Sequence, residues 1–180
     1  MKYRGFKRDG VTFVDSSKLP PFQNGLALVG AREIAALLTR AYWNDYGDDM
    51  PVYNEIVSYG VATNRYMAYQ ALQMRLLDNC IMLNGCSVTS SDCNTSSPKD
   101  LHLAAACVEA IVGAVWADSQ DLPNSADIVA GVMRQFNIYF PRAGVEMAAM
   151  RRELNRLRAI GFLRSVGSAP EKGFFGSANC

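Results

Sequence analysis

Few residues in this sequence have the type and spacing that enzyme or metal chemistry needs. His102 is the only histidine of the 180 residues, so neither a Ser-His-Asp triad nor a histidine-based metal site can be built, and we expect this side chain at the surface or lightly packed. A GxxxxGK(S/T) phosphate loop is absent. The cysteines include no CxxC pair and indicate reduced structural thiols rather than a zinc site or a disulfide framework: Cys80, Cys86, Cys93, Cys107 and Cys180.

Carboxylates remain the candidates for chemistry, and the elements that carry them decide what they can do. Apolar residues recur at three- and four-residue intervals, the period of amphipathic helices. The pattern predicts helices over about 26–43, 52–77 (divided near Gly60), 99–117, 125–136 and 145–160. Pro51 and Ser97-Pro98 suit helix starts, and the Ser/Thr/Asn-rich stretch 84–98 predicts a loop. Because no alternating strand pattern is seen, the sequence predicts an all-α fold.

One apolar face of each predicted helix is expected to be buried. In chain order these faces comprise Leu28, Ala31, Ala35, Leu38 and Ala41; Leu101, Ala105, Val108, Val112 and Val115; Ala126, Val129, Val132 and Met133; and Met147, Met150, Leu154, Leu157 and Ile160. Cys107 lies in the most apolar helix and is expected to be an ordinary small core residue.

Composition limits the class of protein. With 49% hydrophobic residues the chain has enough material for one buried core, which excludes disorder of the whole chain. The net charge of +1 gives no overall basic field that would indicate nucleic-acid binding. The apolar stretch around Ala104–Trp116 is shorter than the roughly 20 residues of a membrane span, and the N-terminus lacks the apolar segment of a secretory signal, so we expect no membrane partner.

Three segments resemble the ribonuclease III family, in the family's order. Leu26–Ala31 (LALVGA) lies where the family has L-E-F-L-G-D, and Ala105–Asp118 (AACVEAIVGAVWAD) resembles A-D-x-L-E-A-L-I-G-A-I-Y-L-D. Between them, Val61–Ala68 (VATNRYMA) resembles L-V-S-N-x-x-L-A. The resemblance implies a ribonuclease III endonuclease-like helical bundle over 24–140, preceded by a basic arm at 1–23 and followed by a C-terminal helix and tail at 141–180.

The same resemblance implies that the catalytic site is degenerate. Family members cleave double-stranded RNA with Mg²⁺ held by four carboxylates, two from each motif helix. Alanine occupies three of these positions, Ala27, Ala31 and Ala106, and only Glu109 is retained. One carboxylate cannot fix a catalytic metal, so we expect a non-enzyme without metal or cofactor, in which Glu109 is structural. None of the nearby acids restores the spacing: Glu33, Asp45, Asp48, Asp49 and Asp100.

A degenerate member of this family is expected to act through its surfaces. By family precedent we expect a mitochondrial large-subunit ribosomal protein that dimerises, through the first motif helix, with another ribonuclease III-like chain. Alternatives are a non-catalytic partner of an active endonuclease in an RNA-processing or RNA-editing complex, or a residual nuclease with another metal arrangement. Contacts to rRNA phosphates or to neighbouring ribosomal proteins are expected from the basic arm and the last helix, and for that helix a solvated basic face is the alternative. The residues are Lys2, Arg4, Lys7, Arg8, Arg151, Arg152, Arg156 and Arg158.

Overall fold

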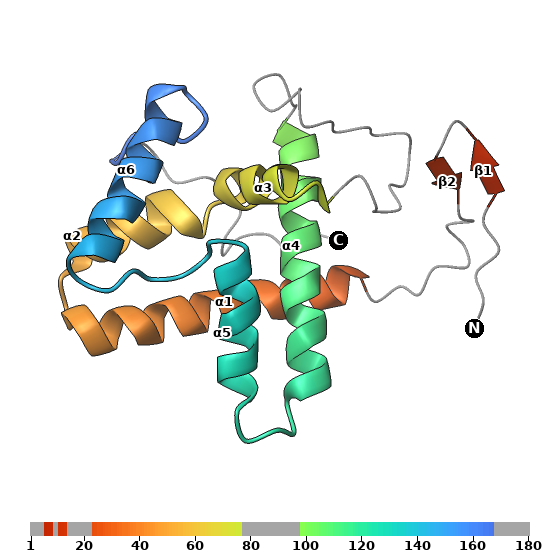
Figure 1. The fold of residues 1–180 in the computed structure, drawn as a ribbon, viewed down its shortest axis with the longest axis horizontal. Coiled ribbons are helices and arrows are strands. Elements are labelled where there is room, and N and C mark those ends of the chain that lie inside the picture. The colour runs from red at the N-terminus through yellow and green to blue at the C-terminus, as the bar shows by residue number, and fades with distance from the viewer. Residues whose placement is uncertain (1–5, 9–10, 14–22, 77–97, 168–180) are drawn as a thin grey trace.

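The protein is described by a computed structural model that covers residues 6–8, 11–13, 23–76 and 98–167. Six α-helices and one π-helical segment account for most of this part of the chain, which confirms the all-α prediction (Figure 1). They are α1 (Gln23–Tyr46), α2 (Met50–Tyr53), η2 (Asn54–Val61), α3 (Asn64–Gln73), α4 (Pro98–Ser119), α5 (Ser125–Gln135) and α6 (Val145–Ala159). The predicted loop at 84–98 lies almost wholly outside the described residues.

A short hairpin in the N-terminal arm was not expected from the sequence. Strands β1 (Phe6–Arg8) and β2 (Val11–Phe13) pair antiparallel, with Phe6 opposite Phe13. Each strand has only three residues, which is too short to produce the alternating pattern by which strands are recognised.

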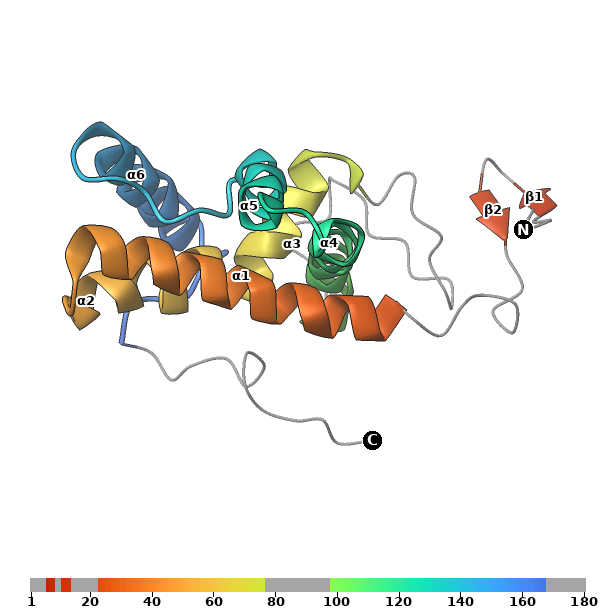
Figure 2. The ribbon, with the colours of Figure 1, turned by 90° about the horizontal axis from the view of Figure 1, so that it is seen from below.

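α4 is the central helix of the domain. It crosses α1, lies beside α5 in an antiparallel hairpin, and packs against α3 on another side (Figure 1). Figure 2 looks along α4 and shows α1 passing across it, with α3, α4 and α5 all on the same side of α1. Leu101–Ser119 is long and apolar enough to cross a membrane by length and composition, so the expectation that this stretch is too short was wrong. Its packing against three helices accounts for the apolar composition.

The core is built from the inner faces of these helices. α1 contributes Ile34, Leu38 and Tyr42, and α4 contributes Ala104, Ala105, Val108 and Val112, all at most 3% exposed. Cys107 is buried, as predicted. The predicted face of α1 was out of phase, because Leu28 is 60% exposed. Burial on this helix begins instead at Gly30, which has no side chain to contribute to a hydrophobic pattern.

Two further buried positions were predicted wrongly. Ala126 is exposed because it lies at the start of α5, where the α4–α5 hairpin extends beyond the other helices (Figure 1). Ile160 is 51% exposed because it is the C-terminal cap of α6, past the last turn that packs on the domain.

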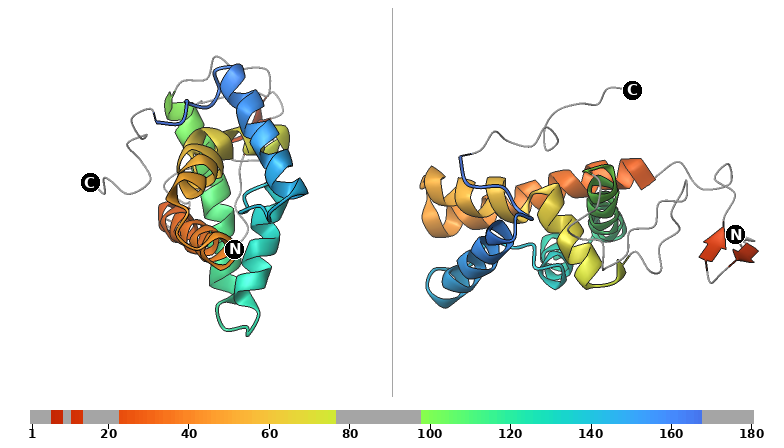
Figure 3. Two further views of the ribbon diagram at one scale, coloured as in Figure 1. Left: turned by 90° about the vertical axis from the view of Figure 1, so that its left-hand side faces the viewer. Right: turned by 90° about the horizontal axis from the view of Figure 1, so that it is seen from above.

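The break predicted near Gly60 is a π-helical segment that ends in a sharp turn. Gly60 has φ −129° and ψ −115°, and a Cβ there would lie 2.9 Å from Leu154 Cδ1 of α6. Thr63 then caps α3, since its Oγ1 accepts a hydrogen bond from the Tyr66 amide at 3.2 Å. α6 packs beside this segment, and the right-hand view in Figure 3 shows it at the far end of the domain from the start of α1.

Candidate functional site

The two principal motif segments meet where α1 crosses α4, and they meet backbone to backbone. A Cβ on Gly30 would lie 1.8 Å from the main-chain oxygen of Glu109, and one on Gly113 would lie 2.0 Å from that of Leu26. Both distances are far below any real contact. Leu26–Gly30 of α1 therefore lies directly against Glu109–Gly113 of α4, and only glycine fits at the two crossing positions.

All four carboxylate positions of the resemblance fall within one turn of this crossing. Ala27 and Ala31 flank Gly30 on α1, and Ala106 lies one turn before Glu109 on α4. Each of the four is half-buried. The structure therefore brings together the positions that the sequence singled out, and three of them present methyl groups.

Glu109 is the one ionisable group among the four positions at the crossing. Burial raises the pKa of its carboxyl to about 7, because the charged form loses solvation beside the apolar helices. Its carboxylate makes no hydrogen bond or ion pair with the described residues. A lone carboxyl of this kind could exchange a proton, but it cannot by itself fix the geometry of a divalent cation.

No cluster of metal-binding side chains is found within 23–76 and 98–167. There, no three His, Cys, Asp or Glu side chains are placed to hold an ion. Of the nearby acids, Asp49 caps α2, accepting from the Val52 amide at 3.4 Å, and Asp45 belongs to the last turn of α1. The exposed His102 pairs with Asn64, with 3.0 Å between His102 Nδ1 and Asn64 Nδ2. The side chain of Asp100 is not described.

The side of α1 turned away from α4 is a mixed apolar and basic surface, here called the outer face of α1. It follows steps of three and four residues and comprises the exposed residues Leu28, Arg32, Ala36, Arg40 and Trp43. Leu28 and Trp43 are 60% and 64% exposed. Leu28 and Trp43 are separated by 15 residues along the helix, so they are two single exposed apolar side chains rather than one continuous patch.

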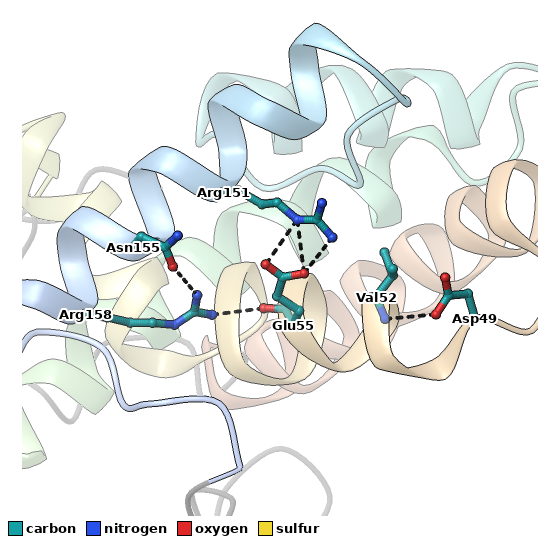
Figure 4. Close-up of polar contacts among 6 residues, drawn as sticks. All are labelled: Asp49, Val52, Glu55, Arg151, Asn155 and Arg158. Atoms are coloured by element: carbon teal, nitrogen blue, oxygen red, sulfur yellow. Dashed lines mark hydrogen bonds and ion pairs between the residues drawn. The ribbon is translucent and has the colours of Figure 1, made fainter.

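Two of the predicted RNA-binding arginines of α6 contact η2. Arg151 forms a bidentate ion pair with Glu55, with 2.8 Å between Nη2 and Oε2 (Figure 4). Arg158 donates to the main-chain oxygens of Glu55 at 3.1 Å and Tyr59 at 3.3 Å. Burial lowers the pKa of the Arg158 guanidinium, and the negative charge of Glu55 offsets part of this lowering. Glu55 lies 96 residues before Arg151, so no local sequence signal could have revealed this pairing.

The other basic residues differ in what they contact. Arg156 binds Glu153 at 2.7 Å and the Tyr69 hydroxyl at 2.6 Å. Arg152 is exposed and makes no hydrogen bond or ion pair to described residues. In the arm, Lys7 and Arg8 belong to β1, where only the backbone is described, and Lys2 and Arg4 lie outside the described residues. RNA binding by this set stays a prediction, and within α6 Arg152 is the residue best placed for it.

Comparison with known proteins gives no match: no family model, no curated protein and no solved structure is similar to this chain.

Proposed function

We propose that this chain is a non-catalytic, ribonuclease III-like structural subunit of a ribonucleoprotein, most simply the mitochondrial large ribosomal subunit. It pairs with another ribonuclease III-like chain through the outer face of α1. The fold positions a former metal site, and the function resides in the surfaces around it.

The observation that carries this proposal is the crossing of Gly30 and Gly113. The resemblance places a motif glycine at each of these positions, and each faces the other helix with no room for a Cβ. The four ligand positions gather around that contact, yet only Glu109 retains a carboxylate. An arrangement that keeps the glycines but lacks three ligands supports a retained fold with a lost metal site.

The outer face of α1 supports pairing. Replacing Glu and Asp by Ala27 and Ala31 removes the like charges that a metal would have balanced on this helix. On the outer face itself, the exposed Leu28 and Trp43 offer apolar area at two separate points, and aromatic residues frequently supply much of the binding energy of an interface.

A photo-crosslinking amino acid at position 43 tests pairing in cells. We expect covalent capture of a ribonuclease III-like chain that co-sediments with the large ribosomal subunit. The same amino acid at the exposed Leu122 of the α4–α5 turn is the matched control and should capture no such chain. Capture of a catalytically competent family member in a ribosome-free complex would support the RNA-processing alternative. Capture of neither class would contradict the pairing.

Restoration of the missing ligands tests the resemblance itself. The triple substitution Ala27→Glu, Ala31→Asp and Ala106→Asp would place four carboxylates around the crossing. We expect Mg²⁺ or Mn²⁺ to raise the Tm of this variant, because a folded-state metal site stabilises by linkage, and to leave the wild-type Tm unchanged. The control is the triple substitution Ala27→Gln, Ala31→Asn and Ala106→Asn, whose amide side chains have the same shape but no charge. Equal Tm responses of the acid and amide sets would contradict the family geometry.

A further inference from the structure

An open pocket of about 360 Å³ lies between α3, α6 and the segment that joins α5 to α6, away from the α1–α4 crossing. Its volume falls within the range of small-ligand sites. The lining combines polar groups with about as much apolar surface, and none of its residues is one of the four ligand positions, although Tyr66 belongs to the Val61–Ala68 motif.

The floor is built from polar groups that bind one another. Tyr66 is 1% and Gln70 4% exposed. The Tyr66 hydroxyl donates to the Asn137 main-chain oxygen at 3.2 Å, and Asn137 Nδ2 donates to Gln70 Oε1 at 3.2 Å. Asn137 adopts φ +54°, a left-handed conformation that asparagine tolerates better than most residues. The floor is thus uncharged and fixed by its own hydrogen bonds.

Two tyrosines of the lining each pack against the guanidinium group of an arginine. The guanidinium carbon of Arg156 lies 5.6 Å from the ring centre of Tyr69, and that of Arg134 lies 4.9 Å from the ring centre of Tyr139. Arg152 is exposed one turn before Arg156 on α6. The carboxylate of the lining, Glu153, is already bound by Arg156. Two arginines therefore lie against tyrosines of the lining, and the one carboxylate that lines the hollow is paired with a guanidinium.

We propose that this pocket binds an unpaired RNA base, with the neighbouring phosphates on Arg134 and Arg152. Tyrosine rings offer stacking surfaces to a base, and carboxamides such as that of Gln73 offer a donor and an acceptor to its edge. Guanidinium groups at the rim suit phosphate oxygens. The inference rests on the ribonucleoprotein part of the proposed function and is independent of pairing through α1.

A protein side chain fits the same pocket less well. An apolar side chain would leave the polar groups of Gln73 and Tyr139 without partners when it displaced water. A lysine or arginine would find its carboxylate partner, Glu153, occupied by Arg156. A neutral ring with hydrogen-bonding edges satisfies both conditions.

Fluorescence anisotropy of the full chain with labelled RNA oligonucleotides, each about ten nucleotides long, tests this inference. We expect single-stranded RNA to bind more tightly than a duplex of the same length, since the bases of a duplex are stacked and paired. Gln73→Ala and Tyr139→Leu should each weaken single-strand binding about tenfold, the scale of a lost base contact. Arg152→Ala should weaken it and reduce its salt dependence.

Matched controls separate the pocket from general charge and from folding. Gln135→Ala removes an exposed helical glutamine outside the lining, and Arg142→Ala removes an exposed arginine from the segment before α6. Both should leave affinity unchanged. Gln73 is exposed, so its variant keeps the fold even if Tyr139→Leu does not.

Three outcomes would overturn the inference: no binding of single-stranded RNA, equal affinity for duplex and single strand, or equal effects of pocket and control variants. Ribosome co-sedimentation of Gln73→Ala distinguishes the two proposals. If the variant loses RNA affinity but the wild type never co-sediments, the pocket stands and the ribosomal assignment fails. If the wild type co-sediments and Gln73→Ala binds RNA normally, the pocket alone fails.

Discussion

The main-chain oxygen of Glu109 lies against the α-carbon of Gly30, so close that a Cβ on the glycine would be 1.8 Å from it. The reciprocal contact joins Gly113 to the Leu26 oxygen on the next turn. Backbone atoms cannot move aside as a flexible side chain can. Any residue larger than glycine at position 30 must therefore separate α1 from α4.

Gly30→Ala should destabilise the fold by at least about 2 kcal/mol, because the added methyl forces the two helices apart. Urea denaturation followed by circular dichroism measures this. Gly131→Ala is the matched control, since nothing lies within 4 Å of a Cβ there. It should stabilise by about 0.5–1 kcal/mol through helix propensity. Equal effects of the two changes would contradict the close crossing.

Glu109→Gln should change the pH dependence of stability. The pKa of this carboxyl rises from 4.5 to about 7 on folding because of burial. Below pH 4.5 both states are protonated and the substitution should have little effect. As pH rises from 4.5 to about 7 the unfolded state ionises first, so the wild type loses stability relative to the variant, by about 1–3 kcal/mol in all, and the difference is constant at higher pH. Urea denaturation of both proteins at about pH 4, 6 and 8 measures it; a pH-independent difference would refute the buried carboxyl.

Arg158→Met should loosen α6 from η2. The substitution keeps the aliphatic volume but removes the hydrogen bonds to the main-chain oxygens of Glu55 and Tyr59. Because the donor is charged, we expect these bonds together to contribute about 1.5–3 kcal/mol to stability. Arg152→Ala, also on α6, should change stability by less than about 0.5 kcal/mol. Hydrogen exchange of the amides in Asn54–Val61 reports the loosening directly. Unchanged exchange in Arg158→Met would show that the Arg158 hydrogen bonds do not help to hold α6 against η2.

The Arg151–Glu55 ion pair should contribute modestly. Its side chains are 44% and 25% exposed, so water screens much of the attraction despite the bidentate geometry. A double-mutant cycle with Arg151→Ala and Glu55→Ala should give a coupling energy of about 0.5–1 kcal/mol that decreases in about 1 M salt. A coupling that salt does not change would indicate a pair far better shielded from water.

Helix positions were predictable from the sequence, whereas the contacts among them were only partly so. Periodicity located each helix because apolar side chains repeat locally. It missed the phase of α1, where the closest contact is made by Gly30, a residue that adds nothing to hydrophobicity. It also missed that Arg151 and Arg158 turn toward the domain, since their partners lie about a hundred residues away. Local pattern cannot report such distant pairs.

The pocket illustrates the same limit. Tyr66, Gln70 and Asn137 come from two segments some seventy residues apart, and each alone is an ordinary helical or turn residue. The candidate ligand positions were found because the motif resemblance supplied their spacing in advance.

The glycine crossing also fixes how α1 is presented to whatever covers it. Side chains between two helices leave room for the helices to slide and rotate. Direct backbone contact at two successive turns allows essentially one relative position of α1 and α4. Leu28 and Trp43 are thus held at a set spacing and angle before any partner arrives. Association with such a rigid face forfeits little conformational entropy, so even a modest apolar area can yield a stable and long-lived complex.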